Sequence, residues 1–251
     1  MVLKNIDTHI VFQQGNLSAH MYNILLYNLK KMDIKAVINL SVDLVNEILK
    51  KKRIIVNVKP KYLISEDMYE HSIRVAVLAV VIGIGYGFSF QSLKHLASSA
   101  LLHDIGKTVI DQNILNKNGK LTDDEYAVVQ QHSLLGYKIL SCYPEITDSI
   151  KTAVLQHHEN ENGTGYPNHI SSDRIHPYAK IIHVADVYDA ILAARPYKSE
   201  QPPKTAVSYI LSHETNLFDK TAGRLLNRYV YEYPCGSELL IKTDHTKKSI
   251  Q

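Results

Sequence analysis

Histidine and aspartate side chains interrupt the most apolar stretches of this 251-residue chain, and that placement limits how the chain can fold. In LASSALLHDIGK, a run of apolar and small residues leads directly into His103 and Asp104. Burying either side chain without a partner is costly, so the fold must bring other polar groups to them. The pattern recurs in EHSIRVAVLA, QQHSLLGYKIL, TAVLQHHEN and IIHVADVYDAI. We therefore expect these segments to meet around one buried polar site.

The hydrophobic pattern is helical almost throughout from about residue 66, and no alternating pattern indicates a sheet. The sequence TDDE at 122–125 is a capping box, which fixes the start of one helix. The class predicted is all-α, with a short N-terminal helical layer at 17–31 and 34–52 and with a small C-terminal strand at 237–242 as an option. The helices predicted after residue 66 are 67–84, 90–103, 122–141, 145–158, 176–194, 203–213 and 218–231.

Three regions are expected along the chain. An extended link around Pro60 separates an N-terminal helical accessory region, residues 1–60, from the main domain at 61–243. Residues 244–251 are predicted to form a flexible tail. The polar stretch 159–175 is a long loop for a compact helical domain, and loops of that length are usually functional.

Composition excludes several classes of protein. The net charge of +3, from 28 basic and 25 acidic residues, is too balanced to predict binding to a nucleic-acid polymer. Cys142 and Cys235 are too few for a disulfide scaffold and are consistent with a reducing cytoplasm. The most lipid-like stretch, residues 75–90, is too short to span a bilayer and holds three glycines, so a buried core helix is expected and no membrane partner.

The buried polar side chains have the composition of a metal site. Five histidines and two carboxylates around one interior would repel one another strongly once protonated, and bound cations keep imidazoles neutral. Imidazole and carboxylate ligands without thiolate suit iron, manganese, nickel or zinc. Seven ligands are too many for one ion and suit two, with Asp104 as the bridge. The expected ligands are His71, His103, Asp104, His132, His157, His158 and Asp186.

These motifs resemble a known family. LLHDIGK is the signature of the HD phosphohydrolase superfamily, and QHHENENGTGYP is similar to its HD-GYP subgroup, as are the segments NILNKNGKLTDDEYAVVQQH and ADVYDAILAARPYK. The resemblance covers about residues 66–241. It implies a helical bundle with two or three divalent ions, usually iron or manganese, held at the same seven positions. It also implies a cytoplasmic phosphodiesterase that hydrolyses cyclic di-GMP to linear pGpG, to GMP or to both, through a hydroxide that bridges the ions.

The resemblance also assigns residues that would contact the substrate. Lys107, after the HD pair, would act in catalysis and bind phosphate, while Arg195 and Lys198 would bind the dinucleotide. Tyr166, in the GYP triplet, would stack on guanine or anchor its loop, and the two readings stay open. The sequence departs from the subgroup at Asn162, where aspartate is usual, and at Ser133, where proline follows the third histidine. Neither departure replaces a metal ligand.

Several alternatives stay open at this level. Asp67 lies four residues before His71, a spacing that places both on one helix face, so we expect it to hold a third ion; an acidic residue at a helix start is the plain alternative. The substrate could be another cyclic dinucleotide, or the chain could be a non-hydrolytic receptor or interaction module. A second copy of the chain and another signalling protein are both open as partners.

Overall fold

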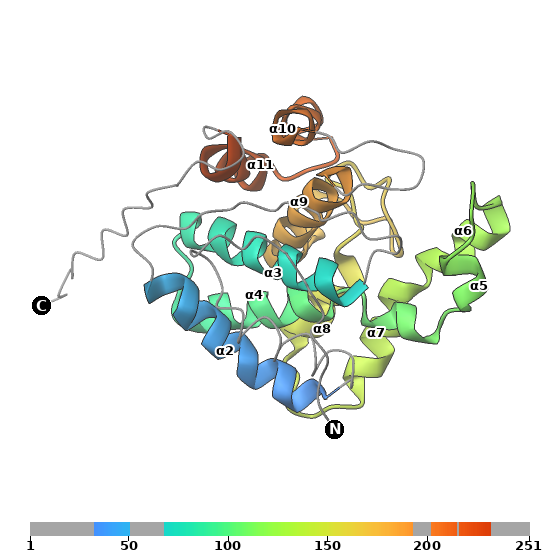
Figure 1. The fold of residues 1–251 in the computed structure, drawn as a ribbon, viewed down its shortest axis with the longest axis horizontal. Coiled ribbons are helices and arrows are strands. Elements are labelled where there is room, and N and C mark those ends of the chain that lie inside the picture. Colours follow the sequence, from blue (N-terminus) through green and yellow to red (C-terminus); the bar gives the residue numbers. More distant parts are fainter. Residues whose placement is uncertain (1–32, 51–67, 193–201, 215, 232–251) are drawn as a thin grey trace, which may run out of the picture.

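The computed structural model describes residues 33–50, 68–192, 202–214 and 216–231 (Figure 1). Within these ranges the chain forms helices and no sheet, which confirms the all-α class there. The expected helix at 17–31, the strand at 237–242 and the tail at 244–251 lie outside them. The elements are α2 (Ile34–Lys50), α3 (Met68–Gly85), α4 (Phe90–Leu102), η1 (Ile105–Val109), α5 (Gln112–Leu115), α6 (Asp123–Gln130), α7 (His132–Ser141), α8 (Asp148–Gln156), η2 (Ser172–Arg174), α9 (Pro177–Leu192), α10 (Pro203–Ser212), α11 (Lys220–Leu226) and the π-helical turn η3 (Asn227–Tyr231).

Helix α3 is the centre of the bundle, and every residue from Glu70 to Gly83 is buried. It packs against α4 and α9 along its length, while α11 and α2 add further contacts (Figure 1). Among the described residues, α3 alone is long and apolar enough to cross a membrane, but 78% of that stretch is buried inside the bundle. The expected core helix in this segment is therefore confirmed.

Helix α2 packs against α4 and shares one hydrophobic core with the rest of the bundle. Val37, Leu44 and Ile48 are fully buried in that core. A buried hydrogen bond also joins the two helices: the Ser41 hydroxyl donates to a carbonyl of its own helix, so the Ser98 hydroxyl donates to Ser41 Oγ, 2.8 Å away. The accessory region at 1–60 therefore contributes at least this helix to the main core.

Truncating a core residue of α2 tests that contribution. We expect Leu44→Ala to lower the free energy of unfolding by about 2–5 kcal/mol, because it removes buried methyl groups and leaves a cavity. Urea unfolding followed by circular dichroism measures the loss. Asn39→Ala, on the exposed face of the same helix, is the control. Equal, small effects of both changes would show that α2 is a dispensable outer layer.

The polar segments differ from the expected pattern in two places. The single helix predicted at 122–141 is two helices, because α6 ends at Gln130 and α7 begins at His132. The capping box is present as predicted: Thr122 Oγ1 accepts from the Glu125 amide, and the Glu125 carboxylate accepts from the Thr122 amide. The segment between the helices predicted at 90–103 and 122–141 contains η1 and α5. Helices α5 and α6 extend away from the bundle, while α10 and α11 lie together beyond α9 (Figure 1).

Candidate metal centre

Five helices bring imidazoles and carboxylates to one point inside the bundle. The positions are mostly helix ends: His103 and Asp104 follow α4, His132 begins α7, and His157 and His158 follow α8. Three of these five residues, His103, Asp104 and His132, are at most 2% exposed, and His157 is fully buried. His71 in the first turn of α3 and Asp186 on α9 complete the set. The structure thus brings all seven sequence-predicted ligands together.

The candidate ligand atoms fall into two groups that share one residue. Asp104, His132, His157 and His158 offer atoms that all lie within 4.8 Å of one another. The second group is His71, His103 and Asp104. Asp186 belongs to neither group by this criterion, but its Oδ1 lies 3.0 Å from His71 Nε2. Since Asp104 is common to both groups, its carboxylate stands where a residue bridging two ions would.

Backbone carbonyls fix the orientation of three of the rings. In each case Nδ1 lies 2.7–2.8 Å from the carbonyl oxygen three residues earlier: His103 with Ala100, His132 with Val129, and His157 with Val154. A carbonyl oxygen only accepts, so Nδ1 must carry the proton. In the neutral ring Nε2 is then an unprotonated acceptor, which is the form that binds a metal.

The resulting contacts between acceptors indicate a cation. The Nε2 atoms of His132 and His157 are 3.2 Å apart, and His132 Nε2 is 3.4 Å from Asp104 Oδ1. Neither contact is a hydrogen bond when both rings are protonated on Nδ1. Among the described residues, His103 Nε2 and Asp104 Oδ1 are buried without a hydrogen-bond partner. Buried lone pairs converging without protons are what divalent cations neutralise, so these residues fit metal ions.

The electrostatics hold three of the histidines and Asp104 in their ligand forms. His71 differs: burial would lower its pKa, but the hydrogen bonds to Asp186 and Asp189 raise it to about 10. Burial, together with the charges of neighbouring histidines, lowers the pKa of His157 and of His158 well below the usual value. Burial also lowers the pKa of His132, although Asp104 opposes the shift. Burial alone would raise the pKa of Asp104, but its interactions with His103, with the Lys107 ammonium and with the other neighbouring histidines hold it well below the usual range. At neutral pH these three imidazoles are therefore neutral and the carboxylate is charged.

A glycine lets the HD segment lie directly against the third histidine. Gly106, in η1, faces α7 so closely that an added Cβ would stand 1.9 Å from the His132 carbonyl oxygen and 2.6 Å from the Gly136 amide nitrogen. Both neighbours are backbone atoms, which cannot turn aside as a side chain would. The glycine of the HDIGK motif therefore sets the distance between Asp104 and His132.

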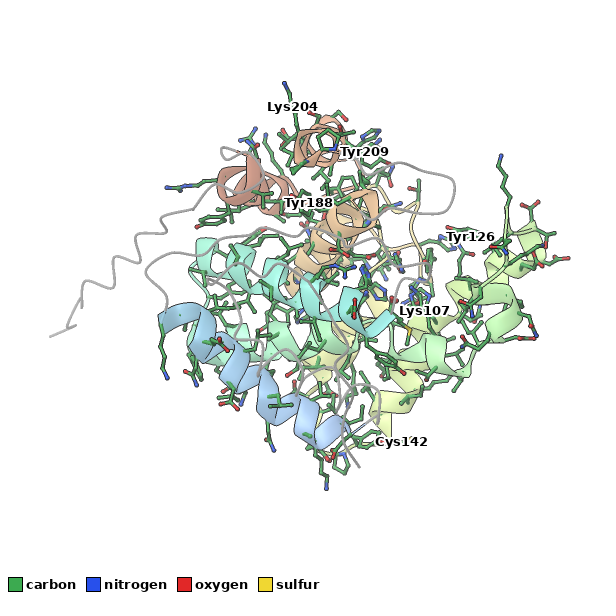
Figure 2. The ribbon with its side chains drawn as sticks, in the orientation of Figure 1. Lys107, Tyr126, Cys142, Tyr188, Lys204 and Tyr209 are labelled. Carbon is green, nitrogen blue, oxygen red and sulfur yellow. The ribbon has the colours of Figure 1, made fainter. Side chains whose placement is uncertain are left out.

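Lys107 lies at the edge of the cluster. Its Nζ donates to Asp104 Oδ2 over 2.6 Å, and its side chain is 27% exposed. In Figure 2 it lies between α3 and the α5–α6 extension, and Tyr126 of α6 is on the same side. One cationic side chain thus contacts the shared carboxylate and also reaches solvent.

The loop at 159–175 covers the cluster with Tyr166. Its ring stacks on His158 at 4.7 Å between centroids, and its amide donates to the His158 carbonyl. Burial is the largest cause that raises the pKa of the Tyr166 phenol, so the hydroxyl keeps its proton and can donate. One face of this ring therefore lies against a candidate metal ligand.

Two side chains that sequence reasoning did not assign hold the same loop. The carboxylate of Glu159, 2% exposed, accepts from the amides of Asn168 and Ile170. Asn162, which replaces the usual aspartate, accepts from Thr164 N through Oδ1 and donates through Nδ2 to Asn216 Oδ1. An aspartate could not donate that second hydrogen bond. The departure from the subgroup pattern thus has a partner in the segment between α10 and α11.

Other expected site residues lie outside the described ranges: Asp67, Arg195 and Lys198. Sequence reasoning also missed Arg74 and Asp189, which are buried beside His71. A signal was present, because Arg74 is one turn after His71 and Asp189 one turn after Asp186, both within apolar helical segments. A second charge one turn after a buried ligand is the pattern that would have found them.

Curated proteins of similar sequence are named as phosphodiesterases. The chain is 35% identical over 166 residues to the "cyclic di-GMP phosphodiesterase response regulator RpfG" of Xanthomonas campestris, covering 65% of this chain and 44% of that protein. It is 38% identical over 138 residues to "3'3'-cGAMP-specific phosphodiesterase 3" of Vibrio cholerae, covering 55% and 30%. The chain thus spans less than half the length of these relatives.

Comparison with solved structures supports the same fold. An HDG"Y"P protein from Bdellovibrio bacteriovorus superposes with a TM-score of 0.63 at 15% identity, covering 83% of this chain and 68% of the other. The family model described as the HD domain matches residues 58–222, a range that includes all seven expected ligands. As the motifs predicted, this chain belongs to the HD domain family.

Proposed function

We propose that this chain is a metal-dependent phosphodiesterase that hydrolyses cyclic di-GMP to linear pGpG, to GMP or to both. The observation that carries the proposal is the position of Asp104, common to two groups of ligand atoms inside the bundle. The names of several curated relatives, at 31–35% identity, support cyclic di-GMP as the substrate.

The assignment of ligands follows the two groups. We propose that Asp104, His132, His157 and His158 hold one divalent ion, and that His71, His103, Asp104 and Asp186 hold the other. Bound there, such ions supply Lewis-acid stabilisation of a phosphodiester and lower the pKa of coordinated water. Iron or manganese suits this set of nitrogen and oxygen ligands, with nickel and zinc as alternatives.

The chain's own residues orient the phosphodiester for attack by water. In the proposed reaction a water oxygen bonds to phosphorus, the bond from phosphorus to the ribose 3' oxygen breaks, and that oxygen takes a proton. Negative charge builds on the phosphoryl oxygens during this exchange, and the Lys107 ammonium at the edge of the cluster is placed to stabilise it. The protonated Tyr166 hydroxyl can donate to the same substrate.

Removing the Lys107 charge tests that role. We expect Lys107→Met to lower kcat by about 10²–10³-fold, the usual effect of losing one donor that stabilises transition-state charge. Metal content should stay at the wild-type value, measured by plasma mass spectrometry beside the kinetics. Lys117→Met, which removes an exposed lysine paired with Glu125, is the matched control. A lower melting temperature with unchanged kcat would assign Lys107 a purely structural role.

Three further residues stay proposals drawn from the resemblance. We propose that Arg195 and Lys198 bind the dinucleotide, so alanine at either position should raise KM more than it lowers kcat. We also propose that Asp67 holds a third ion. An anomalous-scattering metal count on the wild type and on Asp67→Ala tests this, and two ions in both proteins would reject it.

A second substrate class has an observation in its favour. Two relatives from Vibrio cholerae, at 38% and 30% identity, are named 3'3'-cGAMP-specific phosphodiesterases. Hydrolysis of another cyclic dinucleotide is therefore the alternative proposal, and a non-hydrolytic receptor is the third. The cytoplasmic location and a homodimer or signalling partner remain predictions.

One experiment separates the three proposals. Protein purified without oxygen and loaded with Mn²⁺ is mixed with cyclic di-GMP, 3'3'-cGAMP or cyclic di-AMP in water enriched in oxygen-18. Liquid chromatography with mass spectrometry then identifies the products. We expect pGpG or GMP carrying the heavy oxygen on phosphate, with cyclic di-GMP consumed fastest. Faster consumption of 3'3'-cGAMP would establish the second class, and tight binding without any product would establish a receptor.

A further inference from the structure

A buried ion pair lies behind His71, outside the expected ligand set. Arg74 on α3 and Asp189 on α9 are 6% and 1% exposed. Arg74 Nε donates to Asp189 Oδ1 over 2.8 Å and Nη2 donates to Oδ2 over 2.9 Å, so the guanidinium engages both carboxylate oxygens. This forked geometry is the strongest arrangement that an arginine and a carboxylate form, and it fixes the carboxylate in its plane.

The fixed carboxylate contacts a candidate metal ligand. Asp189 Oδ2 lies 2.7 Å from His71 Nδ1, while His71 Nε2 faces Asp186 Oδ1 at 3.0 Å. His71 therefore differs from the three rings that donate Nδ1–H to a carbonyl three residues earlier. The corresponding carbonyl, that of Met68, accepts from the Ser72 hydroxyl. A carboxylate from another helix replaces the carbonyl that the other three rings use.

We propose that Asp189, held by Arg74, is a positioning residue for His71, and that it directs His71 Nε2 toward the metal ion shared with His103 and Asp104. A carboxylate that accepts from Nδ1–H fixes which nitrogen is unprotonated, and it makes the ligand nitrogen more basic than a carbonyl does. This inference rests on the metal centre of the proposed function, and it concerns affinity for the ion rather than turnover.

The geometry explains why both residues are needed. Without Arg74, Asp189 would be a buried carboxylate that has lost the guanidinium bound to both of its oxygens, which is strongly unfavourable. Arg74 without Asp189 would leave a buried guanidinium with its main acceptor removed. The spacing of three residues on each helix lets one turn of α3 carry the ligand and the guanidinium, and one turn of α9 carry Asp186 and Asp189.

The alternative role for this pair is structural, as a simple link between α3 and α9. The test is therefore a comparison of metal affinity with stability. Asp189→Asn keeps the shape of the side chain and removes its charge. Leu192→Ala, three residues further along α9, removes a buried side chain away from the ligands and is the control for destabilisation. Arg74→Lys keeps the positive charge but cannot form the fork, and it serves where Asp189→Asn fails to fold.

Calorimetric titration with Mn²⁺ is the first measurement. We expect the ion nearer His71 to bind about 10–100-fold more weakly in Asp189→Asn, the usual loss when an outer partner of a ligating histidine is removed. The other ion should bind as in the wild type. Arg74→Lys should weaken the same ion by about tenfold. Leu192→Ala should lower the melting temperature and keep both affinities.

Nitrogen-15 NMR of histidine-labelled, Zn²⁺-loaded protein is the second measurement, with His71 identified by its absence from the spectrum of His71→Gln. The Nδ1–H proton should be strongly downfield in the wild type and shifted upfield in Asp189→Asn. Wild-type Mn²⁺ affinity with an unchanged His71 signal in Asp189→Asn would overturn the inference. Equal loss of both ions in Asp189→Asn and Leu192→Ala would also overturn it. A wild-type protein that binds Mn²⁺ but leaves every cyclic dinucleotide intact would refute the proposed function and leave this inference standing.

Discussion

Asp104→Asn should leave a folded helical protein that binds one ion fewer and turns over more than about 100-fold slower, a larger effect than removing an outer partner of a ligand. The amide keeps the volume of the carboxylate but loses the charge that both groups of ligand atoms share. It also replaces the charged acceptor of the Lys107 ammonium with a neutral amide. Metal content by plasma mass spectrometry, far-ultraviolet circular dichroism and turnover of cyclic di-GMP are the three measurements.

The same change at an exposed position controls for the loss of a charge. Asp124→Asn, in the first turn of α6, removes one carboxylate away from the cluster and should keep turnover and metal content. An Asp104→Asn protein that is fully loaded and turns over at the wild-type rate would refute the bridging assignment. Loss of both ions together with loss of helicity would show that Asp104 is needed for folding.

Gly106→Ala should disrupt the centre without changing any ligand. The added methyl would overlap the His132 carbonyl oxygen, so η1 and α7 must move apart. Because the conflict is with backbone, we expect a loss of about 3 kcal/mol or more in the free energy of unfolding, at the upper end for overpacked cores. The separation also moves Asp104 from His132, so Mn²⁺ affinity should fall as well. Urea unfolding and calorimetric titration measure the two effects.

A second glycine, Gly223, provides a matched control at which alanine is expected to change stability little. At Gly223, inside α11, an added Cβ would lie 3.2 Å from a methyl group of Ile210, which can shift. Alanine is favoured over glycine within a helix by about 1 kcal/mol, so Gly223→Ala should stay within about 1 kcal/mol of the wild type. Similar losses at both positions would mean that the tight approach of η1 to α7 is not what Gly106 provides.

The ligand set could be predicted from sequence because histidines and aspartates lie within apolar segments, where burying them without partners is energetically unfavourable. His103 and Asp104 directly follow a run of apolar and small residues, so the sequence already indicates that both side chains are buried. The bundle itself follows from helical periodicity, and α3, α4 and α9 begin and end within two residues of the predicted bounds where they are described. Both predictions rest on local patterns, which the fold preserves.

What sequence reasoning missed depends on which helices become neighbours. No local sequence pattern predicts that Arg74 and Asp189, which are 115 residues apart, form an ion pair. Likewise, neither glycine nor proline marks the break between α6 and α7 at Gln131. Helix α7 packs against η1, and a local sequence pattern does not show a contact of this kind. Asp186 was predicted as a ligand, but its closeness to His71 rather than to the group around His132 is a property of the three-dimensional arrangement.

The carbonyl contacts of His103, His132 and His157 have a consequence for which metal is found. Each ring takes its orientation from its own polypeptide segment, so the ligands stand in place whichever ion arrives. A preset cage of imidazoles and carboxylates favours ions in the general order of their affinities, and cells control occupancy through supply. The ion recovered with the protein should therefore change with the growth medium, and exchange of one ion for another should need no refolding. We therefore expect Mn²⁺ to restore activity to protein from which zinc has been removed.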